Sequence, residues 1–134
     1  MKVVYVDTSA ALKQVRRGTE TDAYIAFLDA ERLSGAQLVS SQLIEVELAR
    51  FAVRENLDHG TRIDPVLEQH ARVAINGDIV RRAVEIPLHV RSLGALHLAT
   101  ALHLGSSLRA LATYDQQLAS VARRLGLTVV SPSA

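Results

Sequence analysis

The sequence predicts an α/β fold in which helices cover both faces of a small parallel sheet. Short runs of β-branched and small apolar residues alternate along the chain with longer segments of helical periodicity, which is the order of β-α units. Such units join parallel strands, because the helix returns the chain to the end of the sheet where the next strand begins. A chain of 134 residues that is 49% hydrophobic has the size of one globular domain, so we expect a single domain over residues 1–134.

Five segments are expected to form the strands. The first is followed by Asp-Thr-Ser at positions 7–9, residue types that commonly begin a helix. The last stops before Pro132, which has no N–H to donate to a neighbouring strand. The predicted strands are Lys2–Val6, Gln37–Ser40, Arg72–Asn76, Arg109–Thr113 and Leu127–Ser131.

Seven segments with helical periodicity connect these strands. Six of the seven glycines follow one of the helices or lie in a turn, where glycine readily adopts a positive φ angle. The seventh, Gly94, lies near the start of the most strongly helical stretch, where glycine costs about 0.5 to 1 kcal/mol relative to alanine. The predicted helices are Thr8–Arg16, Glu20–Leu33, Gln42–Leu57, Asp64–His70, Asp78–Ile86, Leu93–Leu104 and Asp115–Leu125.

The composition excludes several classes of protein. Without cysteine there is no disulfide framework, no zinc-thiolate site and no thiol nucleophile. The N-terminus does not resemble a signal peptide, and no segment is apolar and long enough to cross a membrane, so we expect a cytoplasmic protein. A net charge of +1 and only five aromatic residues argue against a protein that coats nucleic acids or stacks bases on an aromatic platform.

The acidic residues are distributed unevenly. Thirteen of the fourteen lie at or before Glu85, so Asp115 is the one acid of the last 49 residues. Asp7 and Asp115 each follow a predicted strand, and the carboxyl ends of parallel strands form the edge at which α/β proteins bind ligands. Either residue alone is as well explained as a helix N-cap. Two of them at the same edge favour a functional site.

Two glutamates on the third helix are candidates for a third acidic group. On a helix, Glu45 shares a face with the small residues Ala49 and Ala52, which suits close packing against a ligand or another element. Glu47 instead aligns with two arginines. We therefore expect Glu45 to belong to the site and Glu47 to be a solvated partner of arginine, with a plain surface role for Glu45 as the alternative.

Three converging carboxylates favour a hard cation such as Mg²⁺ or Mn²⁺. A metal ion of this kind polarises a phosphoryl oxygen and lowers the pKa of bound water, which phosphodiester hydrolysis requires. The hydroxyls of Thr8, Ser9 and Thr113 flank two of the acids and are able to orient a carboxylate or a water, although caps and turns explain each of them individually. Histidine ligation is the weaker alternative, since His97 and His103 are six residues apart and face different sides of a helix.

Several motifs together resemble the PIN domain, and most closely the VapC toxins of bacterial toxin-antitoxin pairs. They are Val-Asp-Thr-Ser-Ala after the first strand, Ser-x-x-x-Glu-Val-Glu on the third helix, Leu-Gly-Ala-Leu-His-Leu-Ala-Thr-Ala on a later helix, and Ala-Thr-Tyr-Asp before the last helix. The resemblance covers essentially the whole chain. It implies a three-layer α/β/α sandwich, a Mg²⁺- or Mn²⁺-dependent endoribonuclease, a homodimer, and a cognate VapB-like antitoxin that covers the active site.

The resemblance also assigns residues. Asp7, Glu45 and Asp115 occupy three of the family's four acidic positions as catalytic residues, with Asp7 and Asp115 as metal ligands. Gly94 occupies the fourth position, where the family has aspartate. The resemblance therefore implies a toxin scaffold whose RNA cleavage is impaired.

Two other functions remain open. A catalytically inactive PIN module would bind RNA or antitoxin without cleavage. A phosphatase or receiver domain also has aspartates at strand ends, but it would use a lysine near a late strand, and the only lysines are Lys2 and Lys13.

Overall fold

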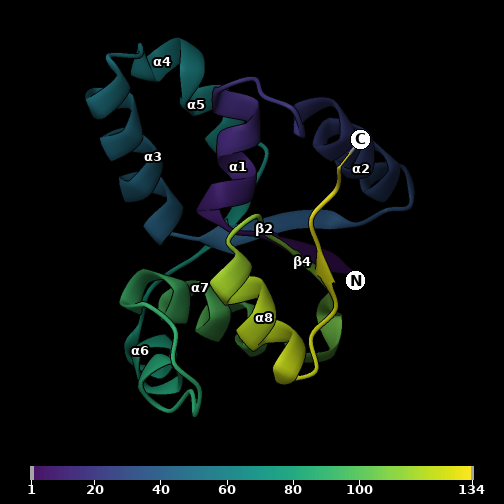
Figure 1. Ribbon diagram of the computed structural model, residues 1–134, viewed down its shortest axis with the longest axis vertical. Helices are drawn as coiled ribbons and strands as arrows, with labels where there is room; N and C mark the ends of the chain where they lie inside the picture. Colours follow the sequence, from purple (N-terminus) through teal and green to yellow (C-terminus); the bar gives the residue numbers. More distant parts are fainter. Residues whose placement is uncertain (1, 134) are drawn as a thin grey trace.

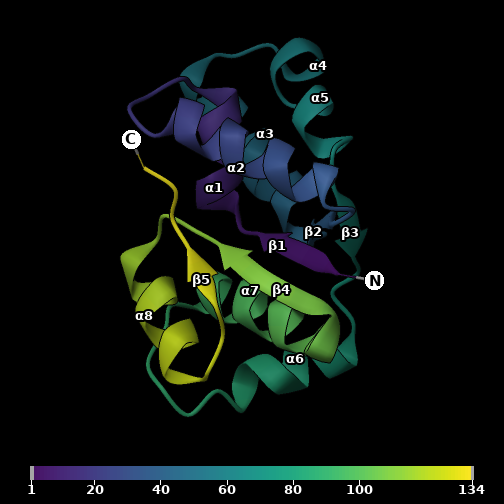
Figure 2. The ribbon, with the colours of Figure 1, turned by 90° about the vertical axis from the view of Figure 1, so that its right-hand side faces the viewer.

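The computed structural model describes residues 2–133 and contains a five-stranded parallel sheet with helices on both faces (Figure 1, Figure 2). All neighbouring strands are parallel, and their order across the sheet is β3-β2-β1-β4-β5. The predicted α/β fold, with layers of helix, sheet and helix, is confirmed. The strands are β1 (Val3–Val6), β2 (Gln37–Ser41), β3 (Ala71–Val73), β4 (Leu108–Ala112) and β5 (Val129–Val130).

The strand order reverses direction at β1. From this central strand the chain adds β2 and then β3 on one side, and it later crosses back to place β4 and β5 on the other side. The connections that leave β1 and β4 therefore run to opposite faces of the sheet. A crevice opens between the carboxyl ends of these two strands, and open α/β sheets bind ligands at such a switch point.

Helices α1 to α5 cover one face of the sheet and α6 to α8 cover the other (Figure 2). None of the helices within residues 2–133 has both the length and the apolar character needed to span a membrane. A short 3₁₀ turn, η1 (Gly105–Ser107), precedes β4. The helices are α1 (Thr8–Val15), α2 (Thr21–Leu33), α3 (Leu43–Glu55), α4 (His59–Arg62), α5 (Asp64–Leu67), α6 (Gly77–Val84), α7 (Ser92–His103) and α8 (Gln116–Arg124).

Each face of the sheet has its own hydrophobic core. Successive side chains of a strand point to opposite faces, so Val4 and Val6 of β1 pack under α1 to α3, while Tyr5 packs on the other side against Leu98 of α7 and Leu118 of α8. All of these side chains are almost completely buried. The two cores hold α3 and α7 on opposite sides of the same strand end.

Most element boundaries differ from the predicted ones by one to three residues, and α4 (His59–Arg62) lies outside the predicted helices. Two of the differences have a clear local cause. The strand expected at Arg72–Asn76 is shorter, because the Asn76 side chain accepts a hydrogen bond from the Ile79 backbone N–H at 3.0 Å and caps α6 instead. The third helix was expected to reach Leu57, but it ends two residues earlier. Asn56 adopts the left-handed conformation with a φ of 55° and terminates α3.

Candidate functional site

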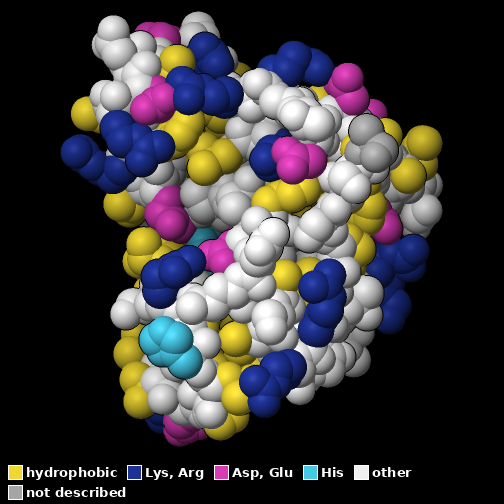
Figure 3. Space-filling view, viewed as in Figure 1, with side chains coloured by type: hydrophobic (Ala, Val, Ile, Leu, Met, Phe, Trp, Pro, Cys, Tyr) yellow, Lys and Arg dark blue, Asp and Glu magenta, His cyan; other side chains and the backbone are white. Residues whose placement is uncertain are grey.

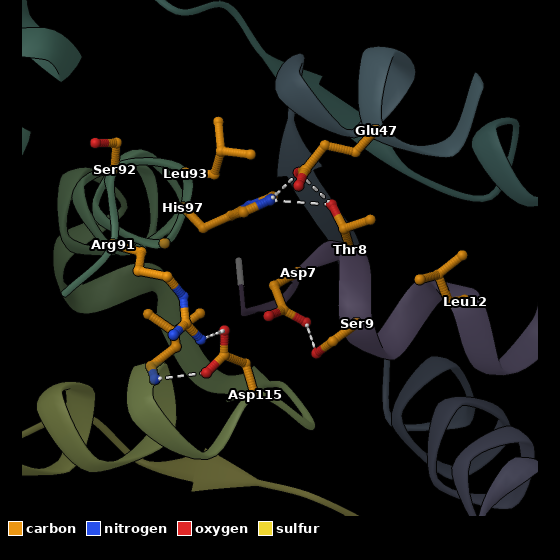
Figure 4. Close-up of a pocket in the computed structure, with 12 residues that line it drawn as sticks. Asp7, Thr8, Ser9, Leu12, Glu47, Arg91, Ser92, Leu93, His97 and Asp115 are labelled. Atoms are coloured by element: carbon orange, nitrogen blue, oxygen red, sulfur yellow. Dashed lines mark hydrogen bonds and ion pairs between the residues drawn. The ribbon is translucent and has the colours of Figure 1, made fainter. Parts of the chain in front are cut away.

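A pocket of about 420 Å³ opens at the switch point, where β1 and β4 end (Figure 4). Three carboxylates line it. Two are Asp7 and Asp115, as the sequence predicts, and the third is Glu47 of α3. In the space-filling view this side of the molecule is hollowed, with acidic side chains in the hollow and basic side chains on its rims (Figure 3).

Asp7 follows β1 and is almost fully buried, with 3% of its surface exposed. Its Oδ1 accepts hydrogen bonds from the Ala10 backbone N–H at 3.0 Å and from the Ser9 hydroxyl at 2.7 Å, so it caps α1. Its Oδ2 accepts from the Thr113 hydroxyl at 2.6 Å. Burial raises the pKa of Asp7 above its ordinary value, although the nearby His97 and the three hydrogen bonds act in the opposite direction.

Ser9 and Thr113 join the two strand ends across the crevice. The Ser9 hydroxyl lies 3.2 Å from that of Thr113 and also accepts the backbone N–H of Tyr114 at 2.8 Å. The Thr113 hydroxyl accepts the backbone N–H of Asp115 at 3.0 Å. These contacts place both hydroxyls against the Asp7 carboxylate.

Asp115 is the N-cap of α8, and its Oδ1 accepts the Leu118 backbone N–H at 3.0 Å. Its Oδ2 lies 3.8 Å from the guanidinium of Arg91, the residue that precedes α7. The Arg91 side chain is 71% exposed, so this ion pair lies at the rim of the pocket (Figure 4). Asp7 and Asp115 therefore cap their helices and line the same pocket.

Glu45, which the sequence analysis placed in the site, does not line the pocket. Its carboxylate points to the other side of α3, where Oε2 lies 3.6 Å from the guanidinium of Arg72 in the neighbouring strand β3. The buried side chains of α3 hold the helix in this orientation, with Ile44 and Leu48 against the sheet. The assignment of Glu45 to the pocket is corrected to Glu47, which lies on the opposite flank of the same buried stripe.

Glu47 is bound by two donors at the mouth of the pocket. Its Oε1 accepts the Thr8 hydroxyl at 2.5 Å and lies 2.8 Å from Nε2 of His97 (Figure 4). Burial alone would raise the pKa of Glu47, but the hydrogen bonds from His97 and Thr8 outweigh it and bring the pKa below the ordinary value of glutamate. Glu47 is therefore ionised at neutral pH.

His97 is the site residue that the sequence analysis underrated. It is buried in α7 and lines the pocket, while its Nδ1 lies 2.6 Å from the hydroxyl of Tyr5 in β1. The spacing between His97 and His103 does not reveal that His97 faces the pocket. The informative spacing is that between Gly94 and His97. Residues three apart share a helix face, so a histidine at position 97 faces wherever position 94 faces.

Gly94 lines the pocket from the first turn of α7. It does not have a positive φ angle, so the backbone does not require glycine there. A Cβ atom added at Gly94 would lie 3.0 Å from Cγ2 of Val90, a contact that a shift of a few tenths of an ångström in the Val90 side chain relieves. The position therefore admits a side chain on the wall of the pocket once Val90 shifts.

The pocket is not a preformed metal site. Among residues 2–133, no three His, Asp or Glu side chains lie close enough together to hold a metal ion. The donor chemistry nevertheless fits a hard cation, because each carboxylate keeps an oxygen with spare capacity: Oδ2 of Asp7, Oδ2 of Asp115 and Oε2 of Glu47. Since Mg²⁺ often takes only one or two protein carboxylates and fills its shell with water, one or two of these side chains together with water would suffice for a weakly held divalent cation.

Comparison with known proteins identifies similar chains. The family model of the PIN domain matches residues 4–130. The chain is 40% identical to Ribonuclease VapC35 of Mycobacterium tuberculosis, over 97% of each chain. It is 32% identical to Ribonuclease VapC46 of the same species, over 99% of this chain and all of that relative.

A solved structure with the same fold is similar over nearly the whole chain. It is the crystal structure of VapBC2 from Rickettsia felis bound to a DNA fragment from their promoter, and the TM-score is 0.74. The match covers 96% of this chain and 97% of that one, at 12% sequence identity. At this identity the likeness concerns the fold.

Proposed function

Because the chain belongs to the PIN-domain family and is a homologue of the VapC ribonucleases, we propose that it is a toxin of a toxin-antitoxin pair built for metal-dependent cleavage of RNA, with impaired activity. The observation that carries the proposal is the convergence of Asp7, Glu47 and Asp115 on one pocket at the switch point of the sheet. Clustered carboxylates are the donors that a Mg²⁺- or Mn²⁺-dependent phosphodiesterase requires.

Asp7 and Asp115 would hold the cation, with Glu47 as the third carboxylate. When bound, the ion supplies Lewis-acid polarisation of the phosphate and an acidified water. The chain's own residues orient these groups. Thr113 and Ser9 hold the Asp7 carboxylate from two sides, and Arg91 at the rim is placed to meet a substrate phosphate.

Gly94 supports the proposal that activity is impaired. It lines the pocket and contributes no carboxylate, whereas the PIN resemblance expects an aspartate at this position. With one carboxylate fewer, the pocket binds a cation less tightly and neutralises less of its charge. We therefore propose a folded chain with little nuclease activity.

A catalytically inactive PIN module is the alternative function. Within residues 2–133 no three His, Asp or Glu side chains are close enough to hold a metal ion, which favours this alternative. Such a module would keep its binding surfaces without a metal site. It would bind RNA or a VapB-like antitoxin and leave RNA uncut.

The partners follow from the same relationship. We propose RNA as the substrate, a VapB-like antitoxin as the inhibitor, a homodimer as the assembly and the cytoplasm as the location. The similar VapBC2 structure supports an antitoxin partner. Light scattering of the purified chain tests the dimer, and co-purification from cells that also express a VapB-like protein tests the antitoxin.

The variant Gly94→Asp tests the catalytic proposal. We expect it to cleave RNA in Mg²⁺ orders of magnitude faster than the parent chain, because the added carboxylate completes the pocket. Gly94→Asn is the matched control, since it adds the same Cβ contact with Val90 without the charge. A Gly94→Asp chain that is folded and leaves a panel of total RNA intact would favour the inactive module.

A further inference from the structure

A network of hydrogen bonds runs from the centre of the sheet, where it is buried, to the partly exposed Glu47. The Tyr5 hydroxyl lies 2.6 Å from Nδ1 of His97, and Nε2 of His97 lies 2.8 Å from Oε1 of Glu47. The Thr8 hydroxyl is 3.0 Å from the same Nε2 and donates to the same Oε1. The network thus links β1, α7, α3 and α1. Its part at the pocket, formed by His97, Glu47 and Thr8, is drawn in Figure 4.

The chemistry of these groups sets which atom donates. An ionised carboxylate only accepts hydrogen bonds, so Nε2 of His97 carries a hydrogen and donates it to Glu47. In a neutral imidazole Nδ1 is then an acceptor, which matches the buried Tyr5 hydroxyl as its donor. Tyr5 therefore holds both the tautomer and the ring orientation of His97.

The two oxygens of Glu47 are used differently. Oε1 takes both donors, whereas Oε2 makes no hydrogen bond or ion pair within residues 2–133. Since Glu47 lines the pocket, Oε2 is the oxygen left for a ligand. Loss of His97 would leave Thr8 as the one donor to Oε1 in the described part of the chain, so the Glu47 side chain, with three rotatable bonds, would sample more orientations.

We propose that His97 is a positioning residue, which binds Glu47 through Nε2 and thereby presents the free carboxylate oxygen of Glu47 to a cation in the pocket. The inference rests on the proposed function, because it takes Glu47 as a pocket carboxylate. It adds a role for α7 in this chain: Gly94 brings no carboxylate to the pocket, and His97, one turn later on the same face, acts through Glu47 instead.

Calorimetric titration with Mn²⁺ at fixed pH tests this role. We expect His97→Leu to weaken Mn²⁺ binding by about tenfold to hundredfold, the usual effect of losing a group that orients a metal ligand. His97→Gln keeps an N–H donor near the position of Nε2, so it should restore most of the affinity. His70→Leu is the matched control, since His70 is equally buried but bonds the Val66 carbonyl away from the pocket.

A double variant separates positioning from a general structural role. In a Glu47→Gln background, His97→Leu should weaken Mn²⁺ binding no further, because its effect passes through the Glu47 carboxylate. Thermal unfolding in a chelator reports stability separately. A loss of Mn²⁺ affinity that persists undiminished in the Glu47→Gln background, or that His70→Leu reproduces, would overturn the inference.

The remaining outcomes distinguish the inference from the proposed function. A parent chain that binds no Mn²⁺ overturns both. A parent chain that binds Mn²⁺ equally well with His97→Leu overturns the inference alone. A Gly94→Asp chain that depends on His97 for Mn²⁺ binding and yet cleaves no RNA overturns the proposed ribonuclease and supports the inference.

Discussion

At the scale of single residues, one aspartate side chain serves both as a helix cap and as a carboxylate of the pocket. Asp7 caps α1 and Asp115 caps α8, and both line the pocket. The helix N-terminus favours a negative charge, so the local role also helps to keep a carboxylate at the site. Their burial differs, since Asp7 is buried and Asp115 is only partly covered. Asp7 therefore bears the larger cost of desolvation.

Asp7→Asn should stabilise the metal-free chain at neutral pH. Burial raises the pKa of Asp7 above its value in the unfolded chain. As the pH rises through the range between these two pKa values, ionisation of Asp7 therefore lowers the free energy of unfolding. Replacing the carboxyl by a neutral amide removes the cost, and we expect the free energy of unfolding to rise by on the order of 1 kcal/mol at pH 7. Chemical denaturation in a chelator measures it.

The stability difference between Asp7→Asn and the parent chain should depend on pH. The advantage of Asp7→Asn should shrink as the pH falls and disappear below about pH 4, the ordinary range of aspartate, where Asp7 is protonated in both states. Asp22→Asn, at an exposed ion pair with Arg17, serves as the control. A variant less stable than the parent at every pH would show that the hydrogen bonds of Asp7 outweigh its desolvation.

Glu47→Ala and Glu45→Ala should separate the two glutamates. Glu47 lines the pocket and Glu45 pairs with Arg72 outside it, so we expect Glu47→Ala to weaken Mn²⁺ binding at least about tenfold and Glu45→Ala to leave it unchanged. Glu45 is partly exposed, so its loss costs at most about 1 kcal/mol of stability. The reverse order of Mn²⁺ affinities would return the site to Glu45.

At the scale of elements, α7 contributes most to the character of the pocket. Arg91, Gly94 and His97 all lie in or beside its first turns and line the pocket. Arg91 contributes a positive charge, Gly94 leaves space for a side chain, and His97 contributes a hydrogen-bond donor. On this wall the pocket therefore has no acid, and its carboxylates come from β1, α3 and α8.

Arg91→Ala should strengthen cation binding slightly. The Arg91 guanidinium lies 3.8 Å from Asp115 and is largely exposed, so it competes with a cation by an amount that solvent screens to at most about 1 kcal/mol. We expect up to about fivefold tighter Mn²⁺ binding at low salt, and a smaller gain at high salt. Titrations at two salt concentrations measure this. Weaker Mn²⁺ binding would mean that Arg91 supports the site.

At the scale of the whole molecule, one sheet couples the two sides of the pocket. Glu47 lies on α3, which packs into the core on one face of the sheet. His97 lies on α7, which packs into the core on the other face. Their contact passes the carboxyl end of β1, between the layers. The pocket geometry therefore depends on both cores being folded at the same time.

Core substitutions test whether the chain unfolds as a single domain. Leu48 and Leu98 are fully buried in the two different cores, so each change to alanine should cost about 2 to 5 kcal/mol. In one cooperative domain, both variants shift the same single transition in denaturant, whether followed by circular dichroism or by tyrosine fluorescence. Two separate transitions in either variant would contradict the expected single domain.

Local sequence patterns are enough to predict the alternation of strands and helices and the placement of Asp7 and Asp115 at strand ends. Both are local properties. β-branched runs and helical periodicity set the elements, and the parallel β-α order places the ends of all strands at one edge. The anomaly at Gly94 was also visible without a structure, since glycine disfavours a helix interior.

Which glutamate faces the pocket depends instead on how α3 packs in the folded chain. Successive helix residues are separated by about 100°, so Glu45 and Glu47 lie on opposite flanks of the stripe formed by Ile44 and Leu48. Which flank faces the crevice depends on the strand order, with β3 beyond one side of α3 and the end of β1 beyond the other. The sequence pattern reveals this apolar stripe but not which elements lie beside it. The contact between Glu47 and His97 joins residues 50 positions apart, so no local pattern indicates it.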